Sequence, residues 1–302
     1  SDSFRLLKHK TQVFLAHTED YYRTRLTHSL EVSQISRAVS RRLGLDEDLA
    51  EVLALSHDLG HPPFAHSGEE ILNRCMKDYD GFDHNAQTLR ILTSLEERYP
   101  LFDGLNLTWE TLEGVVKHNG PLLNPHIVIK EYNNIHDLEL DTFPGLEAQI
   151  ASLSDDIAYN NHDIDDGFRA GLISLSDLKK IELFSEIIKE INYEFKNIDD
   201  YMIVKELIRR LIGLMVNDLI NNTKKNIDKI KPNNPEQIRS QKNLVASFSD
   251  FFISQDNQIR KFLRSRVYEH SSIEKERVRS MRTIEDIFSK LIKDIDLLPT
   301  KL

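Results

Sequence analysis

The spacing of apolar residues along this chain favours helices over most of its length. In the clearest segment, from Arg25 to Leu43, apolar side chains recur every three or four residues, and Gly44 follows as a helix-stop signal. The alternation of apolar and polar residues that is typical of strands is absent nearly everywhere. Glycine and proline number only 11 and 9, which argues against a sheet-rich fold with many tight turns. We therefore expect an all-α protein.

The second half of the chain continues this helical spacing. We expect helices there over residues 176–194, 201–220, 244–269 and 283–293. Two segments have no apolar period: residues 121–145 scatter Pro, Asn and His, and residues 221–242 are rich in Asn, Lys and Pro. We expect both segments to be loops, the second of them exposed.

Length and composition set broad limits on the class of protein. The 302 residues are enough for one large or two ordinary domains, taking about 150 residues per domain. The single cysteine, Cys75, cannot form an internal disulfide, and we expect a cytoplasmic protein. No apolar run approaches the roughly 18 to 20 residues of a transmembrane helix, so we expect no membrane contact. The first residues lack the order of a signal peptide, although the abrupt start at Ser1 leaves open whether residues precede it.

The net charge of −10 is unevenly distributed along the chain. Residues 1–204 carry 19 basic and 36 acidic side chains, whereas residues 205–282 carry 17 basic and 9 acidic ones. An acidic first part suits a cation site, and a basic later part suits phosphates of a nucleotide or of nucleic acid. A solvated helical surface would explain the same counts without a ligand.

Residues 54–70 concentrate the groups that most need a functional explanation. His57, His61 and His66 fall within ten positions, Asp58 follows His57 directly, and Glu69 comes three residues after His66. A Gly-His-Pro-Pro run ends the helix just after the His-Asp pair. Because buried charge is costly unless it is paired or bound to a metal, we infer a metal site with acid/base histidines beside it.

Other parts of the chain offer partners for this pair. His28 lies on the apolar face of its predicted helix, where a lone histidine is more often a core residue than a ligand. Asp155, Tyr159 and Asp163 are spaced four residues apart and therefore share one face of another helix. Two imidazoles and two carboxylates suit a magnesium, manganese, iron or nickel ion better than a closed structural zinc site.

The order His…His-Asp…Asp resembles that of the HD superfamily of metal-dependent phosphohydrolases. More narrowly, four segments resemble the dGTPase-like deoxynucleoside triphosphate (dNTP) triphosphohydrolases. They are residues 22–32 (Tyr-Arg-Thr-Arg-Leu-Thr-His-Ser-Leu-Glu-Val), residues 57–69 (His-Asp-Leu-Gly-His-Pro-Pro-Phe-Ala-His-Ser-Gly-Glu), residues 112–121 (Leu-Glu-Gly-Val-Val-Lys-His-Asn-Gly-Pro) and residues 155–159 (Asp-Asp-Ile-Ala-Tyr). The match runs from about Lys8 to Gly171, and residues 262–270 resemble the family's C-terminal region more loosely.

The resemblance implies a helical HD-domain catalytic core over residues 1–171 and a C-terminal helical region over residues 172–302 that packs on it. It also implies a homo-oligomer (dimer-based, tetramer or hexamer) that cleaves dGTP or several dNTPs into deoxynucleoside and inorganic triphosphate. We expect one divalent metal ion per subunit, Mg²⁺ or Mn²⁺ first, with Fe, Ni, Co or Zn also compatible. Activation by an allosteric dNTP and binding of single-stranded DNA by the basic region stay open.

Carried over by position, the resemblance also implies roles for individual residues. Those that would hold the metal are His28, His57, Asp58 and Asp155. Those that would form the acid/base group beside the α-phosphate are His61, His66, Glu69 and His84. Arg25 would contact phosphate. Those that would hold the sugar near its 3′-hydroxyl are Gln12, Tyr159 and Asp163.

Two other functions fit part of the same pattern. The first is another HD phosphohydrolase, such as a nucleotidase or a cyclic-nucleotide phosphodiesterase, and the second is a non-enzymatic nucleotide sensor or nucleic-acid-binding protein. His118 and Asn119 fit either a supporting role at the site or a structural one. The remaining histidines we interpret as surface or structural residues: His9, His17, His126, His136, His162 and His270.

Overall fold

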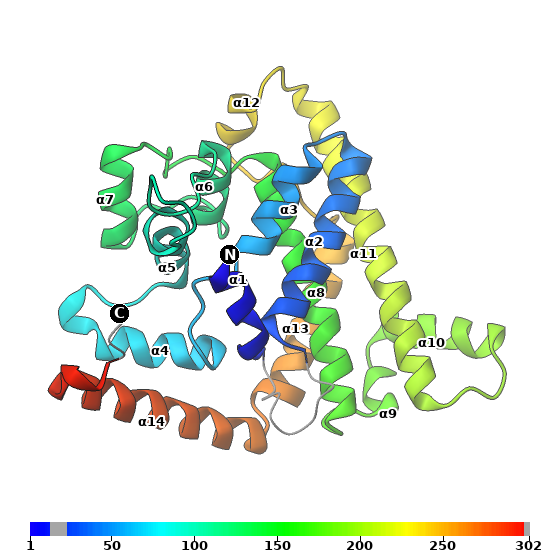
Figure 1. The fold of residues 1–302 in the computed structure, drawn as a ribbon. Helices are drawn as coiled ribbons and strands as arrows, with labels where there is room; N and C mark the ends of the chain where they lie inside the picture. The colour runs from blue at the N-terminus through cyan, green and yellow to red at the C-terminus, as the bar shows by residue number, and fades with distance from the viewer. Residues whose placement is uncertain (13–22, 299–302) are drawn as a thin grey trace.

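The computed structural model describes residues 1–12 and 23–298, and its regular structure is helical (Figure 1). Within these residues, β-type pairing is limited to isolated bridges, so the all-α prediction is confirmed. The first half contains α1 (Asp2–Leu6), α2 (Arg25–Leu43), α3 (Glu47–Ser56), α4 (Ala65–Cys75), α5 (His84–Arg90), α6 (Trp109–Val116), α7 (Ile127–Ile135) and α8 (Leu146–Arg169). The second half contains α9 (Leu175–Leu178), α10 (Glu182–Glu194), α11 (Asp200–Ile230), α12 (Glu236–Arg239), α13 (Asp250–Leu263) and α14 (Ser271–Lys293). One π-helical turn follows α5 and another follows α13.

Helix α8 lies between two apolar cores and packs against α2, α3 and α11 (Figure 1). Adjacent residues on α8 belong to different cores: Ile157 to the core that includes residues of α10, α11 and α13, and Ala158 to the core that includes residues of α2, α3, α5 and α6. A helix that is buried on several sides needs apolar residues around most of its circumference. Polar side chains on such a helix therefore lie inside the molecule, where they must be paired or bound.

The ends of α2 and α3 follow from local capping. Thr24 accepts a hydrogen bond from the backbone of Thr27 at the start of α2, and Gly44 ends the helix with a φ of 72°. Asp46 caps α3, with its side chain accepting from the backbone of the residues two and three positions later. Helix α3 ends at Ser56, so His57 and Asp58 stand at its C-terminal end, as the sequence predicts.

Two loop predictions are wrong in part. Residues 121–145 contain α7, which His126 caps and which buries Ile129. Residues 221–242 contain the last ten residues of α11, almost three turns, and the short α12. The α11 extension is held by polar contacts, because the amides of Asn222 and Asn226 donate to backbone carbonyls of residues 245–248. Such anchoring leaves no apolar period in the sequence.

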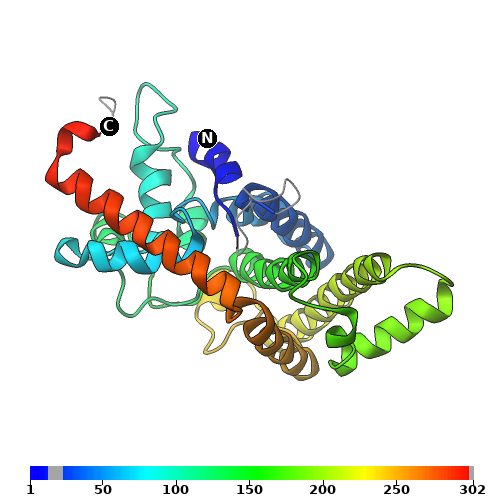
Figure 2. The same cartoon turned by 90° about the horizontal axis from the view of Figure 1, so that it is seen from below.

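Helix α14 lies along α4 and covers its outer side (Figures 1 and 2). It begins at Ser271, twelve residues before the predicted start at 283. Arg277 on α14 pairs with Glu70 on α4 at 2.7 Å. Across residues 1–12 and 23–298, no helix combines the length and the apolar character needed to span a membrane.

Candidate active site

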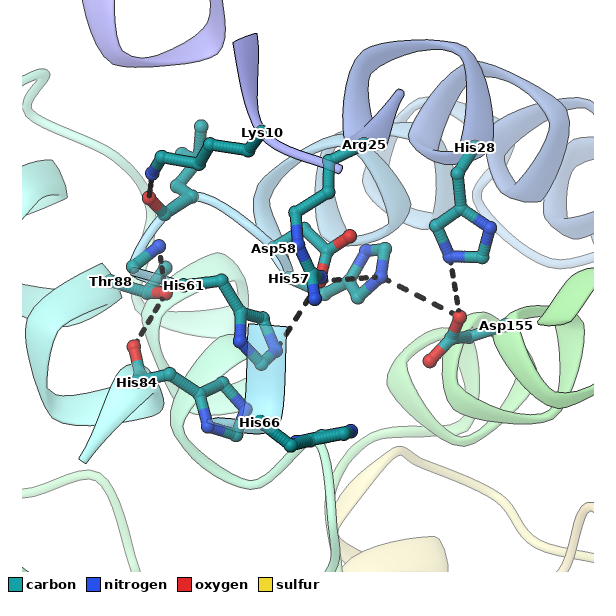
Figure 3. A network of polar contacts seen from close by, with 12 residues as sticks. Lys10, Arg25, His28, His57, Asp58, His61, His66, His84, Thr88 and Asp155 are labelled. Carbon is teal, nitrogen blue, oxygen red and sulfur yellow. Dashed lines mark hydrogen bonds and ion pairs between the residues drawn. The ribbon is translucent and has the colours of Figure 1, made fainter. Parts of the chain in front are cut away.

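Three helices bring the four predicted metal ligands together (Figure 3). His28 comes from α2, the His57-Asp58 pair from the end of α3, and Asp155 from α8. Asp155 Oδ1 lies 2.8 Å from His28 Nε2 and 3.6 Å from His57 Nε2. His28, His57 and Asp58 each offer one donor atom within 4.8 Å of the others. The sequence placed these residues on separate helices, and the fold gathers them at one point.

The polar atoms of this cluster fit a divalent cation. His57 Nδ1 lies 2.7 Å from the carbonyl oxygen of Ala54, so it carries the proton and leaves a lone pair on Nε2. That Nε2 and Asp58 Oδ2 are both buried without a hydrogen-bond partner among the described residues. Buried polar atoms are rarely left unpaired, because the desolvation penalty is then uncompensated. A cation held by His28, His57, Asp58 and Asp155 would satisfy both atoms.

Charges around the cluster keep its carboxylates ionised. Burial opposes ionisation of Asp58, but the charges of Arg25 and His57 outweigh it and hold its pKa below the ordinary value. Burial also opposes ionisation of Asp155, but the nearby imidazoles of His57 and His118, with the hydrogen bond from His28, lower its pKa nonetheless. Both carboxylates therefore offer the negative charge that a divalent cation requires.

Arg25 and Lys10 form a basic pair on the other side of Asp58. Arg25 opens α2 and its Nη1 donates to Asp58 Oδ1 at 2.5 Å. Lys10 Nζ donates to the carbonyl of Leu59 at 3.1 Å, and burial together with the charge of Arg25 lowers its pKa to about 8. Sequence reasoning named Arg25 and missed Lys10, whose only signal was its position two residues before Gln12. Two cations side by side favour a bound anion between them.

The predicted acid/base residues form a second cluster next to the first. The rings of His61 and His84 stack with their centroids 4.1 Å apart. Glu69 Oε1 accepts from the backbone N and from Nδ1 of His84, the latter at 2.7 Å. His66 Nδ1 lies 3.7 Å from Glu69 Oε2, and the His66 side chain is 74% exposed. His61 Nε2 lies 3.5 Å from Asp58 Oδ1, which joins the two clusters.

Gly60 allows the close packing that brings His61 and His84 together. A Cβ at this position would lie 2.1 Å from the carbonyl oxygen of His84, far inside contact distance. The backbone N of Gly60 also donates to Thr88 Oγ1 at 2.9 Å, which fixes the turn against α5. The glycine therefore does more than end α3, because it also permits the backbone to touch α5.

The pKa values of the two stacked histidines, His61 and His84, are shifted in opposite directions. Burial, followed by the charge of Arg25, lowers the pKa of His61 well below its ordinary value. Burial acts in the same direction on His84, but its hydrogen bond to Glu69 and the Glu69 charge raise its pKa overall. Burial opposes ionisation of Glu69, but the nearby His66 and the hydrogen bonds from His84 keep its pKa low. Such a divergence of neighbouring groups is typical of acid/base sites.

The three residues predicted to hold the sugar lie on α8 and in the N-terminal segment. Tyr159 follows Asp155 by one turn of α8, and Asp163 follows by two. The hydroxyl of Tyr268, in the π-helical turn after α13, donates to Asp163, and burial raises the pKa of Asp163 to about 7. Gln12 is buried, with no hydrogen-bond partner for its Nε2 among the described residues. The sequence did not single out Tyr268, although it falls in the segment 262–270 that resembles the family loosely.

Two other histidines, His118 and His162, lie next to the metal cluster. His162, which was predicted to be a surface or structural residue, is buried, and its Nδ1 lies 3.2 Å from His28 Nδ1. Burial lowers the pKa of His162 to about 4, so its ring is neutral at pH 7. His118 stacks on His57 with centroids 5.2 Å apart, and its Nε2 lies 3.6 Å from Asp155 Oδ2. The signal for His162 was its place two turns after Asp155 on the same helix.

Comparison with known proteins agrees with this arrangement. The family model for the HD domain matches residues 25–160, and the model for the phosphohydrolase-associated domain matches residues 246–302. A deoxyguanosinetriphosphate triphosphohydrolase-like protein of Bradyrhizobium sp. (strain ORS 278) is 51% identical over 300 residues, covering 99% of this chain and 77% of the relative. Proteins of the same name from Parvibaculum lavamentivorans and Brucella suis (strain ATCC 23445 / NCTC 10510) are each 48% identical, over 305 and 308 residues, with the same two coverages.

Proposed function

The chain belongs to the deoxyguanosinetriphosphate triphosphohydrolase-like family of HD-domain phosphohydrolases, and on that premise we propose that it hydrolyses dNTPs to deoxynucleoside and inorganic triphosphate. The observation that carries the proposal is the pair of buried, unpartnered ligand atoms, His57 Nε2 and Asp58 Oδ2, set between a basic pair and a carboxylate–histidine pair. Hydrolysis at a phosphorus needs all three: a metal site, a phosphate-binding site and a proton donor.

One divalent ion per subunit would be held by His28, His57, Asp58 and Asp155. Mg²⁺ and Mn²⁺ suit the two carboxylates best, and the two imidazoles also admit Fe, Ni, Co or Zn. When bound, the ion would polarise a phosphoryl oxygen of the substrate and make water a better nucleophile. The chain's own residues supply the other requirements of the reaction.

The basic pair would bind and orient the triphosphate. Arg25 Nε is buried and unpartnered among the described residues, so the guanidinium still has a donor to offer a phosphate oxygen. Lys10 lies next to Arg25, and an anion would relieve the repulsion between the two cations. Both side chains would therefore hold the α-phosphate region against the metal cluster.

His84 is the best candidate to protonate the departing 5′-oxygen. Its Nδ1 hydrogen is committed to Glu69, so the proton that it can give away is on Nε2. The raised pKa favours the protonated ring that such a donor needs. His61, neutral because it is buried, would stack on His84 and fix the plane of its ring. His66 is exposed and lies close to the Glu69 carboxylate, so it would be the member of the acid/base group that faces the substrate.

The sugar would be held beyond the metal cluster along α8. Asp163 and Tyr159 are one turn apart, a spacing that lets both reach one 3′-hydroxyl, with Gln12 as the third contact. The ring of Tyr159 stacked against C2′ would disfavour a ribose. This arrangement would make the enzyme selective for deoxynucleotides over ribonucleotides.

A dNTP panel, tested singly and in pairs with Mg²⁺ or Mn²⁺ and scored for triphosphate release, tests the proposal. Triphosphate and deoxynucleoside in equal amounts support it, and release only from certain pairs would show that a second dNTP activates. Phosphate, pyrophosphate or a monophosphate would instead indicate another kind of HD phosphohydrolase. Nucleotide binding without turnover, unchanged in His57→Ala, would indicate a sensor. Gel filtration and a single-stranded DNA shift assay test the predicted homo-oligomer and the basic region.

A further inference from the structure

We propose that His162 and Glu31 act as positioning residues that hold His28 in its metal-binding orientation and tautomer. They form a relay of hydrogen bonds that runs from His28 Nδ1 through the His162 ring to the Glu31 carboxylate. The inference rests on the metal site of the proposed function, and it concerns residues that lie outside that site.

The geometry shows a continuous path. His28 Nδ1 lies 3.2 Å from His162 Nδ1, and the two rings meet edge to face with an interplanar angle of 80°. The other nitrogen of His162, Nε2, is in short contact with Glu31 Oε2. The other nitrogen of His28, Nε2, faces Asp155 on the metal side. Each ring therefore uses its Nδ1 for the contact between the two rings. Its Nε2 contacts a carboxylate, that of Glu31 for His162 and that of Asp155 for His28.

The chemistry of the end groups decides where each proton sits. An ionised carboxylate only accepts hydrogen bonds, so His162 must carry its proton on Nε2. With its proton on Nε2, the His162 ring has a lone pair on Nδ1 that accepts from His28 Nδ1–H across 3.2 Å. When a cation is bound, His28 Nε2 gives it a lone pair in place of the hydrogen bond to Asp155, and the proton of the His28 ring stays on Nδ1. The Glu31 carboxylate thus selects the tautomer of His28 that can bind a metal, although His162 lies between the two residues.

Glu31 is itself held in place by Arg23. Arg23 Nε lies 3.5 Å from Glu31 Oε2, and Arg23 Nη1 donates to Asp165 and Asp166 at 3.0 Å each. This arginine ties Glu31 on α2 to the end of α8. The relay therefore has a fixed acceptor although the Glu31 side chain is partly exposed.

The tautomer of His57, the other histidine of the metal cluster, is fixed by a different kind of acceptor. Its Nδ1 donates to the carbonyl of Ala54 in its own helix, which also leaves a lone pair on Nε2. A backbone carbonyl can serve there because His57 stands at the end of α3. His28 lies within α2, where the nearby carbonyls are engaged in the helix, so its acceptor comes from α8. Both histidines are thereby presented to the cation as Nε2 donors.

The test is metal affinity, measured by calorimetry with Mn²⁺ on metal-free full-length chain. His162→Leu removes the acceptor and should weaken binding about 10- to 100-fold, the usual effect of losing a partner of a metal-bound histidine. His162→Asn places an amide oxygen near the former Nδ1, so it should accept from His28 and restore affinity to within about threefold of wild type. Glu31→Ala, at a partly exposed position, should also weaken binding, as His162→Leu does. Thermal unfolding of the metal-free variants checks the fold.

The outcomes separate this inference from the proposed function. Wild-type affinity in both His162→Leu and Glu31→Ala would overturn the positioning role while leaving the metal site intact. A wild-type protein that binds Mn²⁺ no better than His57→Ala would overturn the metal site and the positioning role together. Nitrogen-15 spectra of the histidine rings with diamagnetic Mg²⁺ bound give a second readout besides affinity. They should show His28 protonated on Nδ1 in the wild type, and a metal-bound His28 without a proton on Nδ1 would contradict the relay.

Discussion

The two clusters of the candidate site differ in how firmly the fold holds them. The metal cluster comes from the helices α2 and α8 and the end of α3, and His28, His57 and Asp58 are buried. The acid/base cluster comes from the turn after α3, from α4 and from the start of α5, and its members range from the buried His61 to the largely exposed His66. A cation site needs ligands at fixed separations, whereas proton transfer needs groups that reach the substrate. We therefore expect the metal cluster to be rigid and the acid/base cluster to be accessible to the substrate.

The largest effect is expected from Asp58→Asn, in the rigid cluster. The substitution removes a ligand charge and leaves the buried Arg25 guanidinium without its carboxylate. Breaking such a pair should lower the free energy of unfolding by about 3 kcal/mol, and loss of metal charge should lower kcat/KM by about 10³-fold or more. Urea denaturation and dNTP turnover measure the two effects. Near wild-type values for both would show that this cluster is neither rigid nor central.

The next effect separates the clusters. His84→Gln should lower kcat by about 10²- to 10⁴-fold, because the proton donor is lost. Its affinity for Mn²⁺ should stay within about threefold of wild type, because His84 is not one of the four proposed ligands. Calorimetry and steady-state kinetics on the same preparation give both numbers. A fall in metal affinity as large as that of Asp58→Asn would mean that the two clusters work as one metal site.

A smaller, pH-dependent effect is expected from Glu69→Gln. The hydrogen bond and charge of Glu69 raise the pKa of His84, so the neutral amide should lower it again. A general acid works only while protonated, and activity is lost as the pH rises through its pKa. The alkaline limb of the kcat profile should therefore move to lower pH. Glu70→Gln is the matched control, since Glu70 on the same helix pairs with Arg277 and should leave the limb in place.

The smallest effect is expected at the ion pair between α14 and α4, the helix that carries His66 and Glu69. Arg277→Ala removes an exposed ion pair between α14 and α4, which should change the free energy of unfolding by less than about 1 kcal/mol. Activity should be unchanged, because apolar contacts such as that of Ile284 with the backbone region of Gly68 still hold α14 in place. A large loss of kcat in this variant would mean that the ion pair positions His66 and Glu69. Chemical denaturation at low and high salt measures the contribution.

The metal cluster was largely predictable from sequence, and the reason is local. The caps of α2 and the glycine after it define that helix, so the face that carries His28 follows from its period. The place of His57 and Asp58 at a helix end follows from the Gly-His-Pro-Pro run. That these residues meet Asp155 was a hypothesis from the residue types that the resemblance strengthened, because no spacing along the chain reports how α8 crosses α2 and α3.

The features that were missed depend on tertiary contacts. Lys10 and His162 acquire their surroundings from segments far away in the chain, at Leu59 and at His28 with Glu31. The end of α11 was predicted as a loop because asparagine amides anchor much of it, and Ile227 and Ile230 are the apolar residues there that pack against the core. Polar contacts of this kind have no period, and only the folded chain shows which of them are made.

Hydrolysis of a dNTP in water enriched in ¹⁸O tests the central claim most directly, with products read by mass spectrometry. Attack of water on the α-phosphorus breaks the bond to the 5′-oxygen and leaves the new oxygen on phosphorus. One ¹⁸O atom should therefore appear in inorganic triphosphate and none in the deoxynucleoside. Label in the deoxynucleoside, or label released in phosphate or pyrophosphate without triphosphate, would contradict attack at the α-phosphorus by this site.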